Sequence, residues 1–220
     1  LCTNRLGKSR QSRWLPTWNV SGSYDITNEP FMAKTRNWLS QLKLRASYSL
    51  TADTGPSYVT NAMAIYKPKT TWRPFTSASE TQIYIYDIAN NELTYEKKHE
   101  FNIGADLGFI NNRIALTADV YWRNNYDLIG ATFTQGAGGQ IQKMANVADM
   151  KSSGVEFGLS TVNISSEKFK WTTDLIYSHA TNEITSLETS SRAIDLVSGQ
   201  GYALEGYPVR SIFSYKFGGL

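Results

Sequence analysis

Residues 99–127 constrain the fold of this chain more than any other part, because apolar and polar side chains alternate along two runs. Between Phe101 and Phe109 each apolar residue is followed by Asn, Gly or Asp, and an alternation resumes from Ile114 to Arg123 after a short Ile-Asn-Asn turn. Successive side chains of a strand point to opposite faces, so one face of this predicted hairpin is apolar and the other carries carboxylates, an arginine and glycines. An unpaired charge in a dry interior costs several kcal/mol, whereas a water-filled lumen solvates it. The hairpin therefore fits the wall of a transmembrane β-barrel.

The same alternation returns in other segments, which we expect to form further wall strands. They are residues 16–26, 42–50, 154–162, 169–180 and 211–217. Residues 82–88 fit two interpretations, one more wall strand or an extension beyond the membrane. The predicted fold class is all-β, a transmembrane antiparallel β-barrel to which this chain contributes about seven to nine strands.

The composition agrees with a barrel wall. The 220 residues include six Trp, 13 Tyr and nine Phe, the mean hydropathy is −0.37, and no apolar run approaches the roughly twenty residues of a transmembrane helix. A barrel strand turns only every second residue to lipid, so aromatic excess at the two interfaces is a better sign than mean hydropathy. Basic residues are dispersed and the net charge is only +3, which argues against nucleic acid as a partner. Cys2 is the single cysteine, so we expect no intrachain disulfide, no metal site and no role for it.

The predicted connections alternate between short and long. Residues 110–112 and 164–168 form tight turns and residues 27–41 a somewhat longer link, whereas residues 51–96, 128–153 and 182–210 form long loops. In an outer-membrane barrel the long loops face the outside and the short turns face the periplasm. The competing interpretation is a secreted β-sandwich with an adhesive or structural role, in which connections are mostly short. Long loops on one side only favour the barrel.

Several segments, which together cover nearly the whole chain, resemble the barrel of SusC/RagA-like TonB-dependent outer-membrane transporters and occur in the order of that family. The longest is residues 91–109, which continues into 111–114 and 118–121. The others are residues 14–17, 29–32, 38–48, 153–157, 169–171, 205–208 and 211–213. No single segment is specific for this family, but the whole series of segments is.

The resemblance implies the C-terminal part of a 22-stranded barrel in the outer membrane of a Gram-negative bacterium. It implies a multi-pass transporter that is energised by the TonB system, works with a SusD-like surface lipoprotein as its lid, and imports glycans or oligopeptides. We expect residues 1–220 to be one partial barrel domain and an interior piece of a longer polypeptide, without its plug domain, signal peptide and last strands. No cofactor is implied, and the choice between glycan and peptide stays open.

Two sets of side chains are candidates for contacts within such a transporter. The polar face carries charged residues that either contact the plug or the substrate, or form a solvated, mutually compensating lining: Lys43, Arg45, Asp106, Asp119, Arg123, Glu156 and Asp174. The long loops carry aromatic residues that either stack on sugar rings or peptides, or pack within the loops or against the lid: Tyr58, Tyr66, Trp72, Phe75, Tyr84, Tyr86, Phe133 and Tyr202.

Catalysis finds no support in the sequence. His99 and His179 are the only histidines, and neither lies in a Ser or Cys motif. The glycines around Gly138 do not follow a strand-to-helix pattern and lack a subsequent Lys-Ser/Thr, so they do not form a phosphate-binding loop. The sequence therefore predicts a protein that is not an enzyme.

Overall fold

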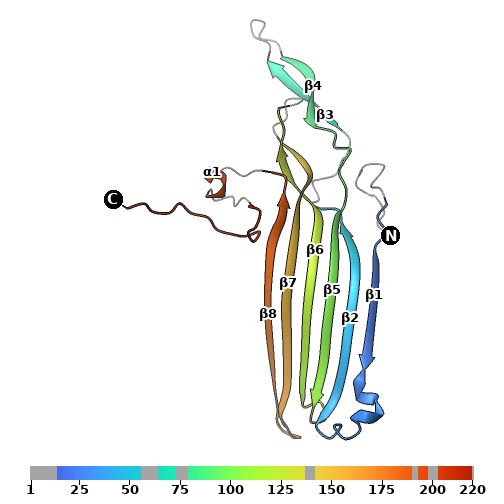
Figure 1. Ribbon diagram of the computed structural model, residues 1–220. Coiled ribbons are helices and arrows are strands. Elements are labelled where there is room, and N and C mark those ends of the chain that lie inside the picture. Colours follow the sequence, from blue (N-terminus) through green and yellow to red (C-terminus); the bar gives the residue numbers. More distant parts are fainter. Residues whose placement is uncertain are drawn as a thin grey trace.

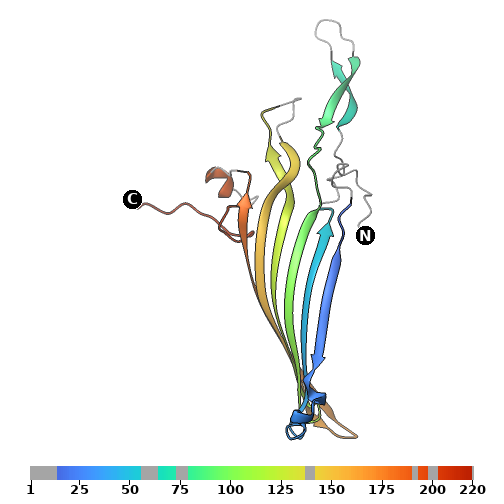
Figure 2. The same cartoon turned by 45° about the vertical axis from the view of Figure 1, so that its right-hand side comes forward.

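A computed structural model describes residues 14–55, 64–72, 79–136, 142–189, 193–197 and 203–219. Its main feature is a tall, curved antiparallel sheet of six strands in the order β1-β2-β5-β6-β7-β8 (Figures 1 and 2). These strands are β1 (Trp18–Asp25), β2 (Leu39–Asp53), β5 (Glu96–Phe109), β6 (Ile114–Phe133), β7 (Gln142–Ser165) and β8 (Lys170–Leu187). The sheet is open, with β1 and β8 at its two edges. The prediction of an all-β, antiparallel fold is confirmed.

The remaining elements are small. Two strands, β3 (Ile65–Trp72) and β4 (Ser79–Asp87), pair into a separate hairpin, which we call the arm because it projects beyond one end of the large sheet (Figure 1). Two 3-10 turns, η1 (Ile26–Asn28) and η2 (Pro30–Met32), connect β1 to β2, and a short helix, α1 (Ala193–Leu196), follows β8. In the described part of the chain, no helix is long and apolar enough to cross a membrane.

The short turns lie together at the end of the sheet opposite the arm, which we call the lower end (Figure 1). The β5–β6 turn is tight because Ile110, Asn111 and Asn112 all have left-handed backbone, with φ of 52°, 54° and 59°. Asn tolerates this conformation better than most residues. At the β7–β8 turn, the backbone N–H of Ser166 donates to the carbonyl oxygen of Phe169 at 2.9 Å. The predicted short connections are confirmed in position.

One face of the large sheet is apolar across all six strands. Nearer its lower end, five leucines lie opposite one another in a single row: Leu42, Leu107, Leu116, Leu159 and Leu175. Side chains on this face are exposed or half-buried; Val20 and Leu175, for example, are 67% and 60% exposed. Large apolar side chains in such a continuous exposed patch indicate contact with another apolar phase, so this face has the character expected of a lipid-facing wall.

Aromatic side chains border the apolar face at both ends. Near the arm, the rings of Phe101 and Trp122 stack with centroids 5.9 Å apart, and near the short turns the rings of Trp38 and Phe109 stack at 6.0 Å. β5 rises about 27 Å from Phe101 to Phe109 at about 3.4 Å per residue. This span is comparable with the roughly 25 Å apolar band of outer-membrane barrels, which aromatic girdles also border.

Two expectations about strands are wrong. Residues 211–217 form no strand, although their side chains alternate. After β8 the chain touches that strand only briefly, through hydrogen bonds between the backbones of Ile184 and residues 206–207, and no described strand lies beside residues 211–217. Alternation reveals which faces a strand would have, but a strand also needs a neighbour to pair its backbone groups.

The second error concerns residues 128–153, which are predicted as a loop. β6 and β7 instead remain paired out to Phe133 and Gln142, beyond the point where β5 begins. The pairing passes two register shifts, at Asn125/Leu128 and Leu128/Ile129, which interrupt the alternation that a sequence pattern depends on. Residues 182–187 likewise continue β8. Residues 82–88 do not form a further strand of the large sheet, since most of them belong to β4 in the arm. This agrees with the alternative interpretation, an extension beyond the wall.

Candidate functional site

The polar face of the large sheet brings three of the predicted charged residues together. Arg45 on β2 holds Asp106 on β5 with two hydrogen bonds, from Nε to Oδ2 at 3.0 Å and from Nη2 to Oδ1 at 3.1 Å. Its Nη2 also donates to Oδ2 of Asp119 on β6 at 3.0 Å. One guanidinium therefore bridges three strands, a fork geometry that only arginine supplies.

Gly104 makes this bridge possible. In the sheet register it lies on β5 directly between Arg45 and Asp119, so the guanidinium has to pass over it. A Cβ atom at Gly104 would collide with Oδ1 of Asp119 and lie 2.8 Å from Nη2 of Arg45. Gly104 thus leaves the space in which the guanidinium of Arg45 crosses β5 to reach Asp119.

A second group lies nearer the arm on the same face. Arg123 donates from Nε to Oε2 of Glu100 at 2.9 Å, and Nζ of Lys98 lies 3.3 Å from the same oxygen. The Arg123 guanidinium also stacks 4.0 Å from the centre of the Tyr121 ring, which is buried over Gly154. Glu100 and Tyr121 are not among the site residues predicted from the sequence, although their position in the alternation places both on the polar face.

The other predicted charges share this face but stand outside the two groups. In the register Lys43 lies opposite Asp25 and Asp106, and Asp174 lies opposite Ser160. Glu156 lies directly opposite Asp119, which places two carboxylates side by side. The polar face is therefore partly compensated, around Arg45 and Arg123, and partly acidic.

A shallow hollow of about 260 Å³ lies on the polar face beside the first group. Its polar lining is formed by Arg45, Asn102 and the serines of β1 and β2, Ser21, Ser23 and Ser47. Hydroxyl, amide and guanidinium groups offer both donors and acceptors, so this surface suits a hydrated polar contact rather than an apolar ligand.

The loop aromatics that the structure describes gather on the arm and beside it. Tyr66 and Trp72 lie on one face of the arm and are 62% and 66% exposed. Tyr84 and Tyr86 lie on the other face, with ring centroids 6.5 Å apart, and Nζ of Lys67 lies 3.2 Å from the centre of the Tyr86 ring. Phe133 ends β6 and is 52% exposed, whereas Tyr58, Phe75 and Tyr202 lie outside the described residues, as does Cys2.

The two histidines lie on the apolar face, opposite the face that carries the charged groups. His99 is held among aromatic rings, and its Nδ1 lies 2.9 Å from the Tyr48 hydroxyl. His179 lies opposite Val155 on β7. Among the described residues, no three His, Cys, Asp or Glu side chains are grouped so that they could hold a metal ion.

The chain is similar to several characterised proteins. "TonB-dependent receptor P3" of Formosa agariphila is 23% identical over 99% of this chain and 22% of its own length. "TonB-dependent receptor SusC" of Bacteroides thetaiotaomicron is 28% identical over 81% of this chain and 18% of its own length. The chain thus spans about a fifth of the length of the curated relatives it matches.

Solved structures have the same arrangement of strands. The RagAB peptide importer in its "closed-closed" state superposes with a TM-score of 0.70 and 25% identity, covering 84% of this chain and 19% of the matched chain. The "open-open" state of the same importer superposes with a TM-score of 0.66 and 27% identity, again covering 84% of this chain and 19% of the matched chain. The family model for the TonB dependent receptor-like β-barrel matches residues 3–218. With one apolar and one charged face, and with this match over nearly its whole length, the chain belongs to the TonB-dependent receptor-like β-barrel family of the outer membrane.

Proposed function

We propose that this chain forms part of the wall of an outer-membrane active transporter that imports glycans or oligopeptides. In this proposal the transporter is energised by TonB and works with a SusD-like surface lipoprotein, and residues 1–220 are one portion of its barrel domain. The likeness to the RagAB peptide importer supports oligopeptides as a substrate class, and the likeness to the TonB-dependent receptor SusC supports energy supply by TonB. The polar face then lines the lumen, where its charged residues contact water, the plug or the passing substrate.

The observation that carries the proposal is the opposition of the two faces across six strands. Arg45, Asp106 and Asp119 form ion pairs on one face, while the leucine row and the exposed side chains of Val20 and Leu175 lie on the other. A sheet of this kind is stable only between water and lipid, because each face would be unfavourable in the other solvent. A transport lumen supplies that water on the inner side.

The proposed orientation places the arm outside the cell and the β5–β6 turn in the periplasm. To test it, single cysteines are introduced at Thr71 on the arm and at Asn111 in the turn of the full-length transporter, after Cys2 and any cysteine outside residues 1–220 are replaced by serine. We expect a membrane-impermeant thiol reagent to label intact cells at position 71 only. Both sites should react after the outer membrane is permeabilised. Labelling of position 111 in intact cells, with position 71 unreactive, would reverse the topology.

The proposed site of substrate capture includes the arm, because an importer first binds its nutrient where the nutrient arrives. We expect that replacing residues 65–87 by a short Gly-Ser linker weakens uptake or lid docking while the barrel still assembles, since surface loops contribute little to wall pairing. The measurement is growth of the full-length variant on defined glycans or peptides as sole nutrient, with heat-modifiable gel migration as the assembly control.

Point variants refine the same test. Tyr66→Ala with Trp72→Ala removes the exposed rings from one face of the arm, and Thr71→Ala on the opposite face is the matched control. We expect the double variant to reduce uptake of the true substrate and the control to leave it unchanged. The substrate that loses uptake identifies the class, glycan or peptide. Undiminished growth of the arm-deleted transporter on every substrate would contradict a role for the arm.

A further inference from the structure

The most completely buried described side chains lie at the end of the sheet near the arm, not within the wall. Leu93 and Tyr95 are only 1% exposed, and Val147 and Asn90 are 5% and 7% exposed. Residues 90–95 return from the arm toward β5, and here they pack against the part of β6 and β7 that extends beyond the wall. We call this region the upper cluster. We call residues 90–95 the returning segment.

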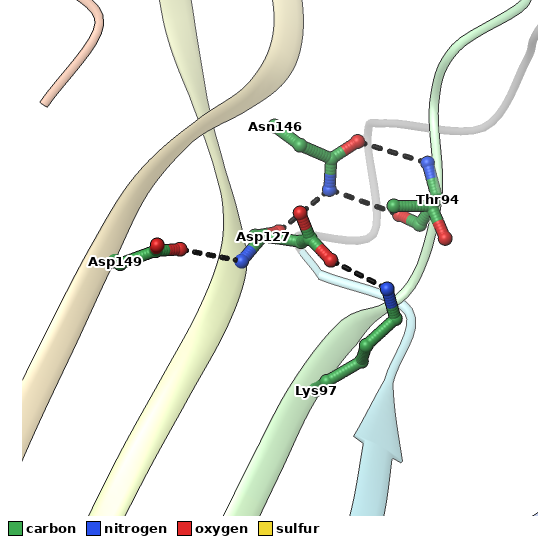
Figure 3. A network of polar contacts seen from close by, with 5 residues as sticks. All are labelled: Thr94, Lys97, Asp127, Asn146 and Asp149. Atoms are coloured by element: carbon green, nitrogen blue, oxygen red, sulfur yellow. Dashed lines mark hydrogen bonds and ion pairs between the residues drawn. The ribbon is translucent and has the colours of Figure 1, made fainter. Parts of the chain in front are cut away.

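Asn146 on β7 is the centre of hydrogen bonding in the upper cluster (Figure 3). Its Oδ1 accepts from the backbone N–H of Thr94 at 2.8 Å, and its Nδ2 donates to the carbonyl oxygen of Thr94 at 3.1 Å. The same Nδ2 donates to the carbonyl oxygen of Asp127 at 2.6 Å. The amide group thus pairs both backbone groups of Thr94, as a neighbouring strand would, and links them to β6.

The backbone around Asp127 needs hydrogen bonds from side chains, because no neighbouring strand supplies them. β5 pairs with β6 only as far as Lys97 and Tyr126, so beyond that point the backbone of β6 has no described strand on this side. Asp127 follows immediately, with left-handed backbone at φ 58° where the β6–β7 register shifts. Unpaired backbone groups are costly when they are covered, and three side chains satisfy them here.

Those three side chains come from different elements. Oδ1 of Asp149 accepts from the N–H of Asp127 at 3.0 Å, Asn146 donates to its carbonyl oxygen, and Oε1 of Glu96 accepts from the N–H of Ile129 at 2.8 Å. The carboxylate of Asp127 in turn pairs with Nζ of Lys97 at 2.6 Å (Figure 3).

Asn90 provides a second attachment of the returning segment. Its Nδ2 donates to the carbonyl oxygen of Met144 on β7 at 2.8 Å, and its Oδ1 accepts from the N–H of Glu92 at 3.2 Å. The returning segment is therefore held to β7 at Asn90 and at Thr94, on either side of buried Leu93. Both attachments use a side-chain amide, that of Asn90 on the returning segment and that of Asn146 on β7, and neither belongs to the hydrogen-bond ladder of the wall.

We infer that Asn146 is a positioning residue, which fixes the base of the arm to the β6–β7 extension so that the two move as one unit above the wall. The inference predicts that loss of the Asn146 amide frees residues 90–95 and leaves the wall intact. Its consequence for uptake rests on the proposed function, because a freed arm would no longer hold its aromatic surface in place over the lumen.

The test is hydrogen exchange of the full-length transporter in detergent or lipid, comparing wild type, Asn146→Ala and Asn163→Ala. Asn163 is the matched control, since it lies on the same strand and donates from Nδ2 to Oγ1 of Thr173 at 2.7 Å, at the lower end. We expect Asn146→Ala to accelerate exchange of residues 90–95 by about tenfold or more, because the N–H of Thr94 loses its acceptor and the segment loses its attachment to β7. Exchange of residues 114–122 in the wall should not change, and Asn163→Ala should match wild type throughout residues 90–129.

Two results would overturn the inference. Unchanged exchange of residues 90–95 would show that Asn146 does not fix them, and equal acceleration in residues 114–122 would show that it supports the wall instead. Asn90→Ala removes the second attachment and is expected to give the same local pattern, so it decides the question if Asn146→Ala does not assemble.

Uptake separates this inference from the proposed function. If the wild-type transporter imports a defined glycan or peptide, Asn146→Ala should raise the apparent KM severalfold while the maximal rate stays within about twofold. An accelerated exchange with an unchanged KM would overturn the positioning of a capture surface. If wild type imports neither class, the proposed function fails, whereas the exchange experiment still tests the attachment of the arm.

Discussion

Leu116→Arg is expected to destabilise the full-length barrel by about 1–3 kcal/mol, because an arginine facing lipid costs about 2–4 kcal/mol at the middle of an outer-membrane wall and about 0–1 kcal/mol near its interfaces. Leu116 lies between these limits, one residue pair above the aromatic border at Phe109. Leu116 occupies the centre of the leucine row, between Leu107 on β5 and Leu159 on β7. An arginine there has no water and no acidic neighbour on its own face. The measurement is the free energy of unfolding in denaturant after refolding into lipid vesicles.

Thr117→Arg is the matched control, one residue along the same strand. Thr117 is exposed on the polar face and lies opposite Asp106, so water and a carboxylate are both available to the new guanidinium. We expect this variant to cost much less than Leu116→Arg. Equal costs for the two variants would show that lipid and lumen are not separated by these two faces.

Gly154→Ala is expected to destabilise the wall by about 1–3 kcal/mol, a typical cost of adding a methyl group to a filled space. Gly154 lies on β7 directly opposite Tyr121, whose ring covers it. A Cβ atom here would collide with that ring and lie 2.9 Å from the carbonyl oxygen of His179 on β8. The ring can rotate away only by losing its stacking on Arg123, and the backbone of β8 cannot move without disturbing its ladder.

Gly158→Ala provides the comparison, because Gly158 lies four residues further along β7 on the same face. The nearest atom to a Cβ there is Cβ of Thr117 at 4.0 Å, an ordinary van der Waals distance, so a methyl group fits without displacing it. Alanine is favoured over glycine in a strand interior, so this variant should be neutral or slightly stabilising. The unfolding titration that serves for Leu116 ranks the pair, and a cost at Gly158 equal to that at Gly154 would refute the packing argument.

The absence of enzyme chemistry expected from the sequence agrees with the family. TonB-dependent receptors and SusC-like proteins are transporters rather than enzymes. The two histidines occupy packing positions: both lie on the apolar face, and the ring of His99 contacts the aromatic rings of Tyr48 and Tyr126.

The faces of the wall strands could be predicted from local pattern alone. Along β5 each residue alternates in side with its neighbour, so Asp106 and Leu107 are assigned to opposite faces without knowledge of any partner strand. The same reasoning places Lys43, Arg45, Asp119 and Glu156 together on one face, as the register confirms. Pattern fails where the backbone departs from regular pleating, at the register shifts that follow Asn125.

By itself, then, the sequence determined that this chain is a wall with one apolar and one polar face, because side-chain alternation is a property of each strand separately. Only the tertiary structure decided which charges meet. Arg45 reaches Asp119 across Gly104 because the pairing of β2, β5 and β6 places these three residues in one line. It also decided that Asn146 pairs with the backbone of Thr94, 52 residues away in sequence. Contacts between distant segments depend on register and on where each strand ends, and neither is encoded in the alternation of any single segment.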